Sequence, residues 1–79
     1  MLSLREREAM LERAENAILQ RAVTPMSTAE LVQELRKEGI GSYYVRAGVL
    51  FLLDRGEIAL VDDRKLIVSD RAVLPAGVV

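Results

Sequence analysis

The side chains of this 79-residue chain that could bind a ligand fall in two short segments. The first, GSYYVRAG at residues 41–48, carries a hydroxyl, two phenols and a guanidinium, and the second is an Arg-Lys pair that follows two aspartates. Groups of these kinds donate hydrogen bonds to phosphates and to the edges of bases. They define a candidate nucleic-acid-binding set: Ser42, Tyr43, Tyr44, Arg46, Arg64 and Lys65.

The charge around this set is balanced. Residues 40–69 carry four basic and four acidic side chains, and the whole chain has a net charge of −1. Non-specific affinity for DNA comes mostly from cationic contacts with phosphates, and this region has no cationic excess. A solvated hairpin tip is therefore an equally good interpretation of Arg64 and Lys65, because the neighbouring Asp62 and Asp63 are common turn formers.

The sequence contains little evidence for catalytic activity. The chain has no cysteine and no histidine, which excludes disulfides, cysteine-ligated zinc and thiol chemistry and removes the usual general base near neutral pH. The glutamates of residues 6–15 alternate with arginines, which is typical of an exposed helix face. The adjacent Asp62 and Asp63 are weak evidence for a cation site. We expect no enzyme activity, no catalytic residue, no metal and no cofactor.

Residues 42–55 predict a helix that is apolar on almost every side. At 100° per residue, the side expected to face the core holds Val45, Gly48, Val49 and Leu52. The opposite side and its apolar flank hold Tyr43, Ala47, Leu50 and Phe51. A domain this small cannot cover so much apolar surface by itself, so this side predicts a second molecule. The alternative is that the first helix or the C-terminal tail covers Phe51 and also Leu50 or Leu53.

Two Ser-x-x-Glu segments match the capping box and predict helices over about 4–22 and 28–38. On the first helix, Leu4, Leu11 and Ile18 fall seven residues apart, so they form a single apolar stripe. We expect this stripe to face the core of the domain or a partner.

Proline and glycine mark where these helices end. Pro25 is expected to end the first helix, and Gly39 the second. The third helix is expected over 42–55, with Ser42 as its N-cap and Gly56 after its last residue. Gly48, inside this helix, is expected to let another helix approach closely.

Two short runs rich in β-branched residues follow the helices. Residues 58–61 and 66–68 are separated by the polar residues 62–65, a pattern that predicts a β-hairpin. The last ten residues, 70–79, have no clear period, and we interpret them as a frayed terminus or a docked segment. The expected fold class is α+β, mostly α, with three helices and a two-stranded hairpin in one domain.

The order of these elements resembles the winged helix-turn-helix superfamily. Its first two helices are similar to AILQRAVTPMSTAELVQELRKEG, its recognition helix to IGSYYVRAGVLFLLDRGEI, and its wing to IALVDDRKLIVSD. The resemblance implies a winged-helix core over 14–69, preceded by a helix extension over 1–13. It also implies buried side chains at Ile40, Val45, Val49, Leu52 and Ile58.

This superfamily implies a DNA-binding transcriptional regulator, with the candidate set on the recognition helix and the wing and double-stranded DNA as the ligand. We expect a homodimer with these interface residues: Leu4, Met10, Leu11, Tyr43, Ala47, Leu50 and Phe51. The alternative is a non-enzymatic adaptor or subunit that binds a protein through the apolar outer face of the third helix, because this helix offers few of the donors that read bases. The charged N-terminus and the short uncharged runs predict a cytoplasmic protein with no membrane segment.

Overall fold

The two capping boxes begin helices in the computed structural model, which describes residues 2–61 and 64–69. They precede α1 (Leu4–Arg21) and α2 (Thr28–Arg36). In each box the serine hydroxyl accepts a hydrogen bond from the N–H of the glutamate, and the glutamate carboxylate accepts one from the N–H of the serine. Both starts were correctly predicted, because the motif satisfies the free N–H groups of a first turn locally.

Three expected helix boundaries were wrong. α2 ends at Arg36 rather than Glu38, since the N–H groups of Glu38 and Gly39 bond to carbonyls three residues back and form a tighter turn. α1 ends at Arg21, so Pro25 does not end it directly. α3 (Ser42–Asp54) has Gly41 as its N-cap, with Ser42 already inside the helix and no side-chain hydrogen bond at the cap.

Two glycines allow the chain to turn after α2 and α3. Gly39 and Gly56 have φ values of 81° and 75°, a left-handed conformation that costs glycine little. The expectation that these glycines follow the ends of the second and third helices is confirmed.

The predicted hairpin exists and gains a third strand. β2 (Ile58–Val61) and β3 (Lys65–Val68) are antiparallel, with Ile58 opposite Val68 and Val61 opposite Lys65. β1 (Met26–Ser27) pairs with the other edge of β3, which gives the strand order β1-β3-β2. The expected two-stranded hairpin was therefore incomplete, since a two-residue strand leaves no pattern in a sequence.

Lys65 belongs to β3 rather than to the loop in which the sequence placed it. The loop prediction for Asp62 and Asp63, and the prediction of a tail over 70–79, lie outside the described residues.

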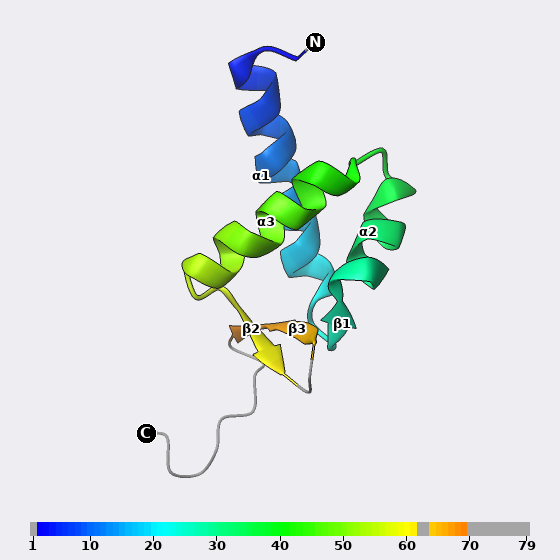
Figure 1. The fold of residues 1–79 in the computed structure, drawn as a ribbon, viewed down its shortest axis with the longest axis vertical. Helices are drawn as coiled ribbons and strands as arrows, with labels where there is room; N and C mark the ends of the chain where they lie inside the picture. The colour runs from blue at the N-terminus through cyan, green and yellow to red at the C-terminus, as the bar shows by residue number, and fades with distance from the viewer. Residues whose placement is uncertain (1, 62–63, 70–79) are drawn as a thin grey trace.

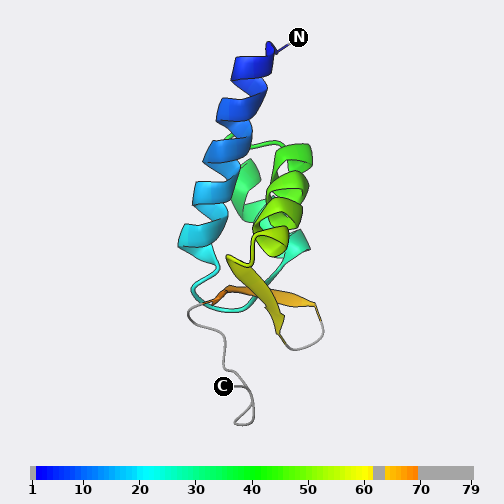
Figure 2. The ribbon, with the colours of Figure 1, turned by 90° about the vertical axis from the view of Figure 1, so that its left-hand side faces the viewer.

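The core lies where the C-terminal half of α1 meets α2 and α3 above the sheet (Figures 1 and 2). The five side chains that the resemblance placed in the core (Ile40, Val45, Val49, Leu52 and Ile58) are all buried. The inward residues of α2 are Leu31, Val32 and Leu35. The fold is α+β and mostly helical, and its layout is compatible with the winged-helix arrangement.

α1 extends well beyond the other helices at its N-terminal end (Figure 1). Its buried residues begin only at Ala14, while Leu4 is 71% exposed and Leu11 is half-buried. Only the C-terminal part of the stripe, at Ile18, is buried in the core, and Leu4 lies beyond the compact part of the domain, as the predicted helix extension implies. The heptad spacing predicts a shared helix face, but it does not predict where the neighbouring helices end.

α1 and α3 cross at Gly48. A Cβ atom built on this glycine would lie 3.0 Å from Cδ1 of Ile18 and 3.6 Å from Cγ of Glu15. These distances show that the two helices approach closely because residue 48 has no side chain, as the sequence predicted.

Candidate functional site

The two sides of α3 have opposite environments, although both are apolar. Val45, Gly48, Val49 and Leu52 are buried against α1 and α2. On the other side, Tyr43 is 73% exposed, Leu50 68% and Phe51 48%. We call Tyr43, Ala47, Leu50, Phe51 and Asp54 the outward face of α3.

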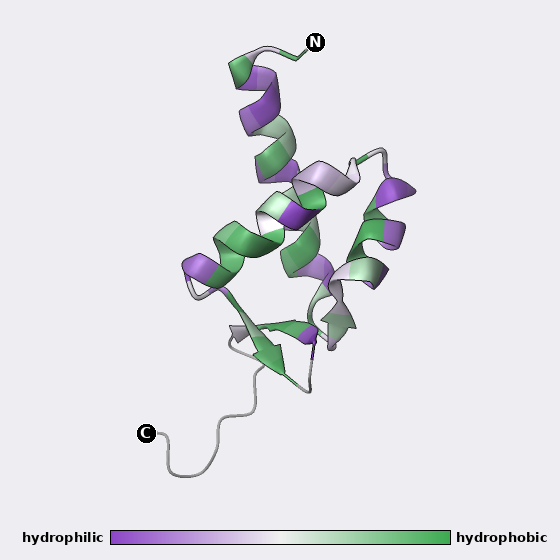
Figure 3. Ribbon diagram, in the orientation of Figure 1, coloured by the Kyte–Doolittle hydropathy of each residue, from purple (hydrophilic) through white to green (hydrophobic). Residues whose placement is uncertain are grey.

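The outward face follows from helix geometry. Tyr43, Ala47, Leu50 and Asp54 are spaced i, i+4, i+7 and i+11, so they form one stripe on the helix surface. Figure 2 shows that no other helix of the described chain lies outside α3 on this side. Figure 3 shows hydrophobic residues over much of the length of α3.

The chain covers part of this apolar surface by itself. Leu53 is half-buried and packs against the core, and so does Tyr44. The alternative of coverage by the protein's own elements therefore holds for Leu53. Leu50 is exposed and only about half of Phe51 is covered, while the predicted coverage by the C-terminal tail lies outside the described residues.

At the start of α3, Tyr44 packs against the core and Tyr43 is exposed to solvent. Their rings meet edge to face, with centroids 5.1 Å apart and planes at 85°. Because Tyr44 packs on the core, its ring supports the ring of Tyr43, which is exposed. Tyr43 is thus a pre-positioned aromatic anchor with a free phenol end.

The candidate nucleic-acid-binding residues are spread over two elements. Arg46 on α3 is exposed, as are Arg64 and Lys65 at the β2–β3 turn, while Ser42 is half-buried. Within residues 2–61 and 64–69, no hydrogen bond or ion pair joins the α3 group to the hairpin group. Lys65 lies near Glu30 at the start of α2, and the pKa of that carboxyl is lowered mainly by its hydrogen bonds with Ser27 and to a smaller extent by the charge of Lys65.

Arg55 has a structural role that the sequence did not reveal. Its guanidinium donates to Glu15 of α1 at 2.9 Å and to Glu57 at 2.7 Å. These two hydrogen bonds raise the pKa of Arg55. Through these hydrogen bonds Arg55 ties the end of α3 to α1.

Sequence reasoning missed Leu60 of β2, which is 59% exposed. Leu60 pairs with the buried Leu66 and so lies on the same face of the sheet. The run Ile58–Val61 is entirely apolar, so it contains no alternation that could have marked an exposed position.

The α1 residues predicted for an interface lie on a separate element from the outward face of α3. Leu4 is exposed near the projecting end of the helix, and Met10 and Leu11 are half-buried. They are therefore a second, weaker candidate surface, with exposed charged residues around Leu4.

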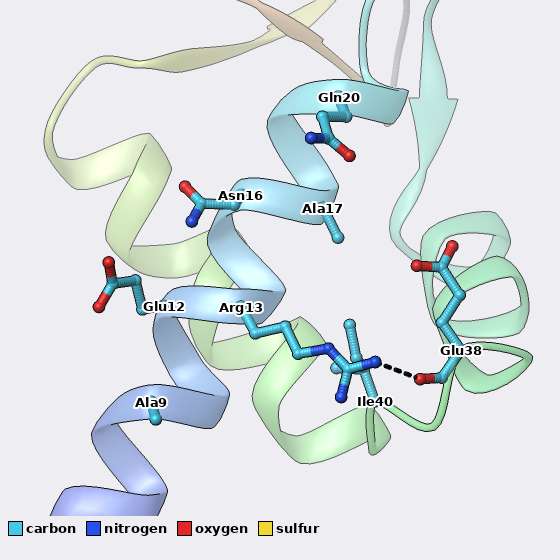
Figure 4. Close-up of a pocket in the computed structure, with 8 residues that line it drawn as sticks. All are labelled: Ala9, Glu12, Arg13, Asn16, Ala17, Gln20, Glu38 and Ile40. Carbon is cyan, nitrogen blue, oxygen red and sulfur yellow. Dashed lines mark hydrogen bonds between the residues drawn. The ribbon is translucent and has the colours of Figure 1, made fainter.

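A polar hollow of about 400 Å³ lies between α1 and the turn after α2 (Figure 4). Arg13 crosses it and donates to the carbonyl oxygen of Glu38 at 2.8 Å, while the carboxylate of Glu38 pairs with Arg21. The side chains of Glu12 and Asn16 point away from Glu38 in Figure 4. The polar groups of this hollow hold α1 against the turn, and they do not converge on a point where a ligand would sit.

We compared the chain with known proteins. No protein-family model, curated protein or solved structure matches it. Among the residues that the structure describes, no group of three or more His, Cys, Asp or Glu side chains could hold a metal ion. Across the same described ranges, no helix is both long and apolar enough to span a bilayer.

Proposed function

We propose that this protein is a non-enzymatic interaction module that binds another protein chain through the outward face of α3. The observation that carries the proposal is the exposure of Tyr43, Leu50 and Phe51 on one side of a helix whose other side is buried. Aromatic and large aliphatic side chains that are held rigidly and left exposed are the typical anchors of protein interfaces.

The size of this surface is consistent with docking. Tyr43, Leu50 and Phe51 together expose on the order of 400 Å², which is as large as the largest apolar patch of most monomers. At ~25 cal/mol per Å², its burial contributes about 10 kcal/mol before the costs of association. Those costs are roughly 4–15 kcal/mol, so the face supports binding of weak to moderate affinity.

The same face is poorly suited to reading DNA. Base readout in the major groove uses guanidinium, amide and hydroxyl groups, and here only the phenol of Tyr43 and the nearby Arg46 can supply them. If α3 lay in the major groove of DNA, the apolar side chains of Leu50 and Phe51 would lie against the polar edges of the bases. This contrast favours a protein partner over DNA.

The experiment is site-specific photo-crosslinking in the source cell. One chain carries a photoreactive side chain at Leu50, and a matched chain carries it at Gln33, which is exposed on α2. We expect a protein adduct that is specific to the Leu50 position and can be identified by mass spectrometry. The purified pair should then bind in a titration, and Leu50→Asp should weaken that binding roughly tenfold or more. Equal adducts from both positions, or none, would contradict the proposal.

A second candidate function, a DNA-binding regulator, has two observations in its favour. Arg46, Arg64 and Lys65 are all exposed, and α3 begins without a side-chain cap, as a helix that approaches a phosphate would. A fluorescence titration with random duplex DNA at low salt tests it. Binding that weakens with salt and with Arg46→Ala would favour this candidate. The absence of binding at high micromolar protein would reject it.

A further inference from the structure

We propose that the partner of the outward face is a second copy of this chain, with the two α3 helices packed antiparallel across a two-fold axis. The inference rests on the proposed function, because it names the protein that the outward face binds. It depends on the order of residues along that face. When two copies lie antiparallel, the residues that come level with each other are complementary.

The spacing of the face produces this complementarity. Tyr43 and Asp54 lie at its two ends, about 17 Å apart along an α-helix. An antiparallel copy that is centred between Gly48 and Val49 brings each Tyr43 level with Asp54 of the second copy. The same axis brings each Ala47 level with Leu50 of the second copy.

These pairings match in chemistry and in size. A phenol O–H donates a hydrogen bond to a carboxylate, so Tyr43 and Asp54 can satisfy each other across the interface. Ala47 leaves space beside the helix, and Leu50 is a side chain that can fill it. Because the axis repeats each pairing, one interface gains two of each kind.

The charges favour the antiparallel arrangement. Arg46 and Asp54 are both exposed and lie eight residues apart. In the antiparallel pair, Arg46 of one copy lies within one helical turn of Asp54 of the other. In a parallel pair, Asp54 of one copy would face Asp54 of the other, which is destabilising.

The area predicts the strength of the dimer. Two outward faces bury on the order of 800 Å², whereas stable interfaces bury roughly 1,200–2,000 Å² in total. We therefore expect a reversible dimer with a Kd on the order of 10–100 μM rather than an obligate one. Its population should rise steeply over that concentration range.

The first experiment measures the mass of the full chain by sedimentation equilibrium across this range. We expect a monomer–dimer equilibrium, with Leu50→Asp weakening association roughly tenfold or more. Because Leu50 is exposed, this variant should fold, and far-UV circular dichroism checks that it does. Leu4→Asp tests the competing candidate interface on α1, where Leu4 is equally exposed, and Gln33→Asp on the exposed side of α2 is the neutral control. A dimer that is lost in Leu4→Asp and kept in Leu50→Asp would overturn the α3 interface.

The second experiment tests the orientation. Because the chain has no cysteine, single cysteines report contacts cleanly. Ala47→Cys and Leu50→Cys chains are mixed and oxidised mildly, with Gln33→Cys as the control. We expect disulfides between the Ala47→Cys and Leu50→Cys chains to form several-fold faster than disulfides within either variant alone. Crosslinks that form no faster than those of Gln33→Cys would contradict the pairing.

The two proposals can fail separately. A chain that stays monomeric up to about 1 mM while the photoreactive side chain at Leu50 captures a different protein rejects the second copy and keeps the docking function. An adduct at Leu50 with the chain itself, together with the concentration-dependent dimer, supports both. A monomer without any specific adduct at Leu50 rejects both.

Discussion

The inner and outer sides of α3 have similar composition and opposite consequences. The inner side, which includes Val45 and Leu52, is buried by α1 and α2, and a glycine on it sets the distance between the helices. On the outer side, Leu50 and Phe51 are exposed to solvent. Burial of an apolar side chain stabilises the fold only where partner atoms exist in the same chain. The inner side thus holds the domain together, while the outer side is free to stabilise an assembly.

The largest expected effect comes from truncating matched leucines on the two sides. Leu52→Ala should lower the free energy of unfolding by about 2–5 kcal/mol, because it opens a cavity in the core. Leu50→Ala should change it by less than about 0.5 kcal/mol. Urea denaturation at low micromolar protein, where the chain is monomeric, measures both. Similar losses for the two variants would show that the outer side is packed in solution.

A second matched pair compares the small residues of the two sides. Gly48→Val should lower the free energy of unfolding by about 1–3 kcal/mol, because its branches would overlap Ile18 and Glu15 where α1 crosses. Ala47→Val should cost about 0.5 kcal/mol or less, mostly through helix propensity. Thermal unfolding checks both variants. If Gly48→Val were tolerated as well as Ala47→Val, the close crossing of α1 and α3 would not exist.

The same contrast explains what the sequence could predict. The starts of α1 and α2 were predicted because a capping box is closed within four residues. The core positions of α3 were predicted because helix geometry separates its two sides. β1 was not predicted, because a two-residue strand forms by pairing with β3 and has no sequence pattern of its own.

For the candidate site, an uncovered outer side of α3 could be predicted from the sequence, but which of its leucines stay exposed could not. Leu53 and Leu50 have the same side chain, yet the first packs on the core and the second does not. Leu4 and Ile18 share a stripe on α1, but only Ile18 lies where other helices reach. Exposure depends on where neighbouring elements end, which no local pattern records. The predicted interface on α1 and the predicted DNA contacts stay predictions.

A smaller effect is expected at the two capping boxes, which again differ in packing. Ser27→Ala should lower the free energy of unfolding by about 1 kcal/mol, since it frees an N–H group at the start of α2, beside the sheet. Ser3→Ala should have a clearly smaller effect on global unfolding, because the start of α1 projects beyond the core and can fray by itself. Urea denaturation of both variants provides the comparison. Equal losses would mean that the end of α1 unfolds together with the core.

The smallest expected effect is the pH dependence that Glu30 adds. The N–H of Ser27 donates to its carboxylate at 3.0 Å, and this hydrogen bond, followed by the one with the serine side chain, lowers the pKa of Glu30. A pKa that is lower in the folded chain stabilises the fold above the ordinary pKa of glutamate, and this contribution is lost as the pH falls through the lowered value.

Glu30→Gln should therefore be less stable than the unchanged chain near pH 7, and the difference should shrink as the pH falls below the ordinary pKa of glutamate. Urea midpoints at several pH values measure this difference. Gln33→Ala, on the same helix, introduces no titrating group and should keep a constant offset from the unchanged chain. If the Glu30→Gln difference stayed constant as the pH fell below the ordinary pKa of glutamate, the negative charge of the carboxylate would not contribute to the stability of the start of α2.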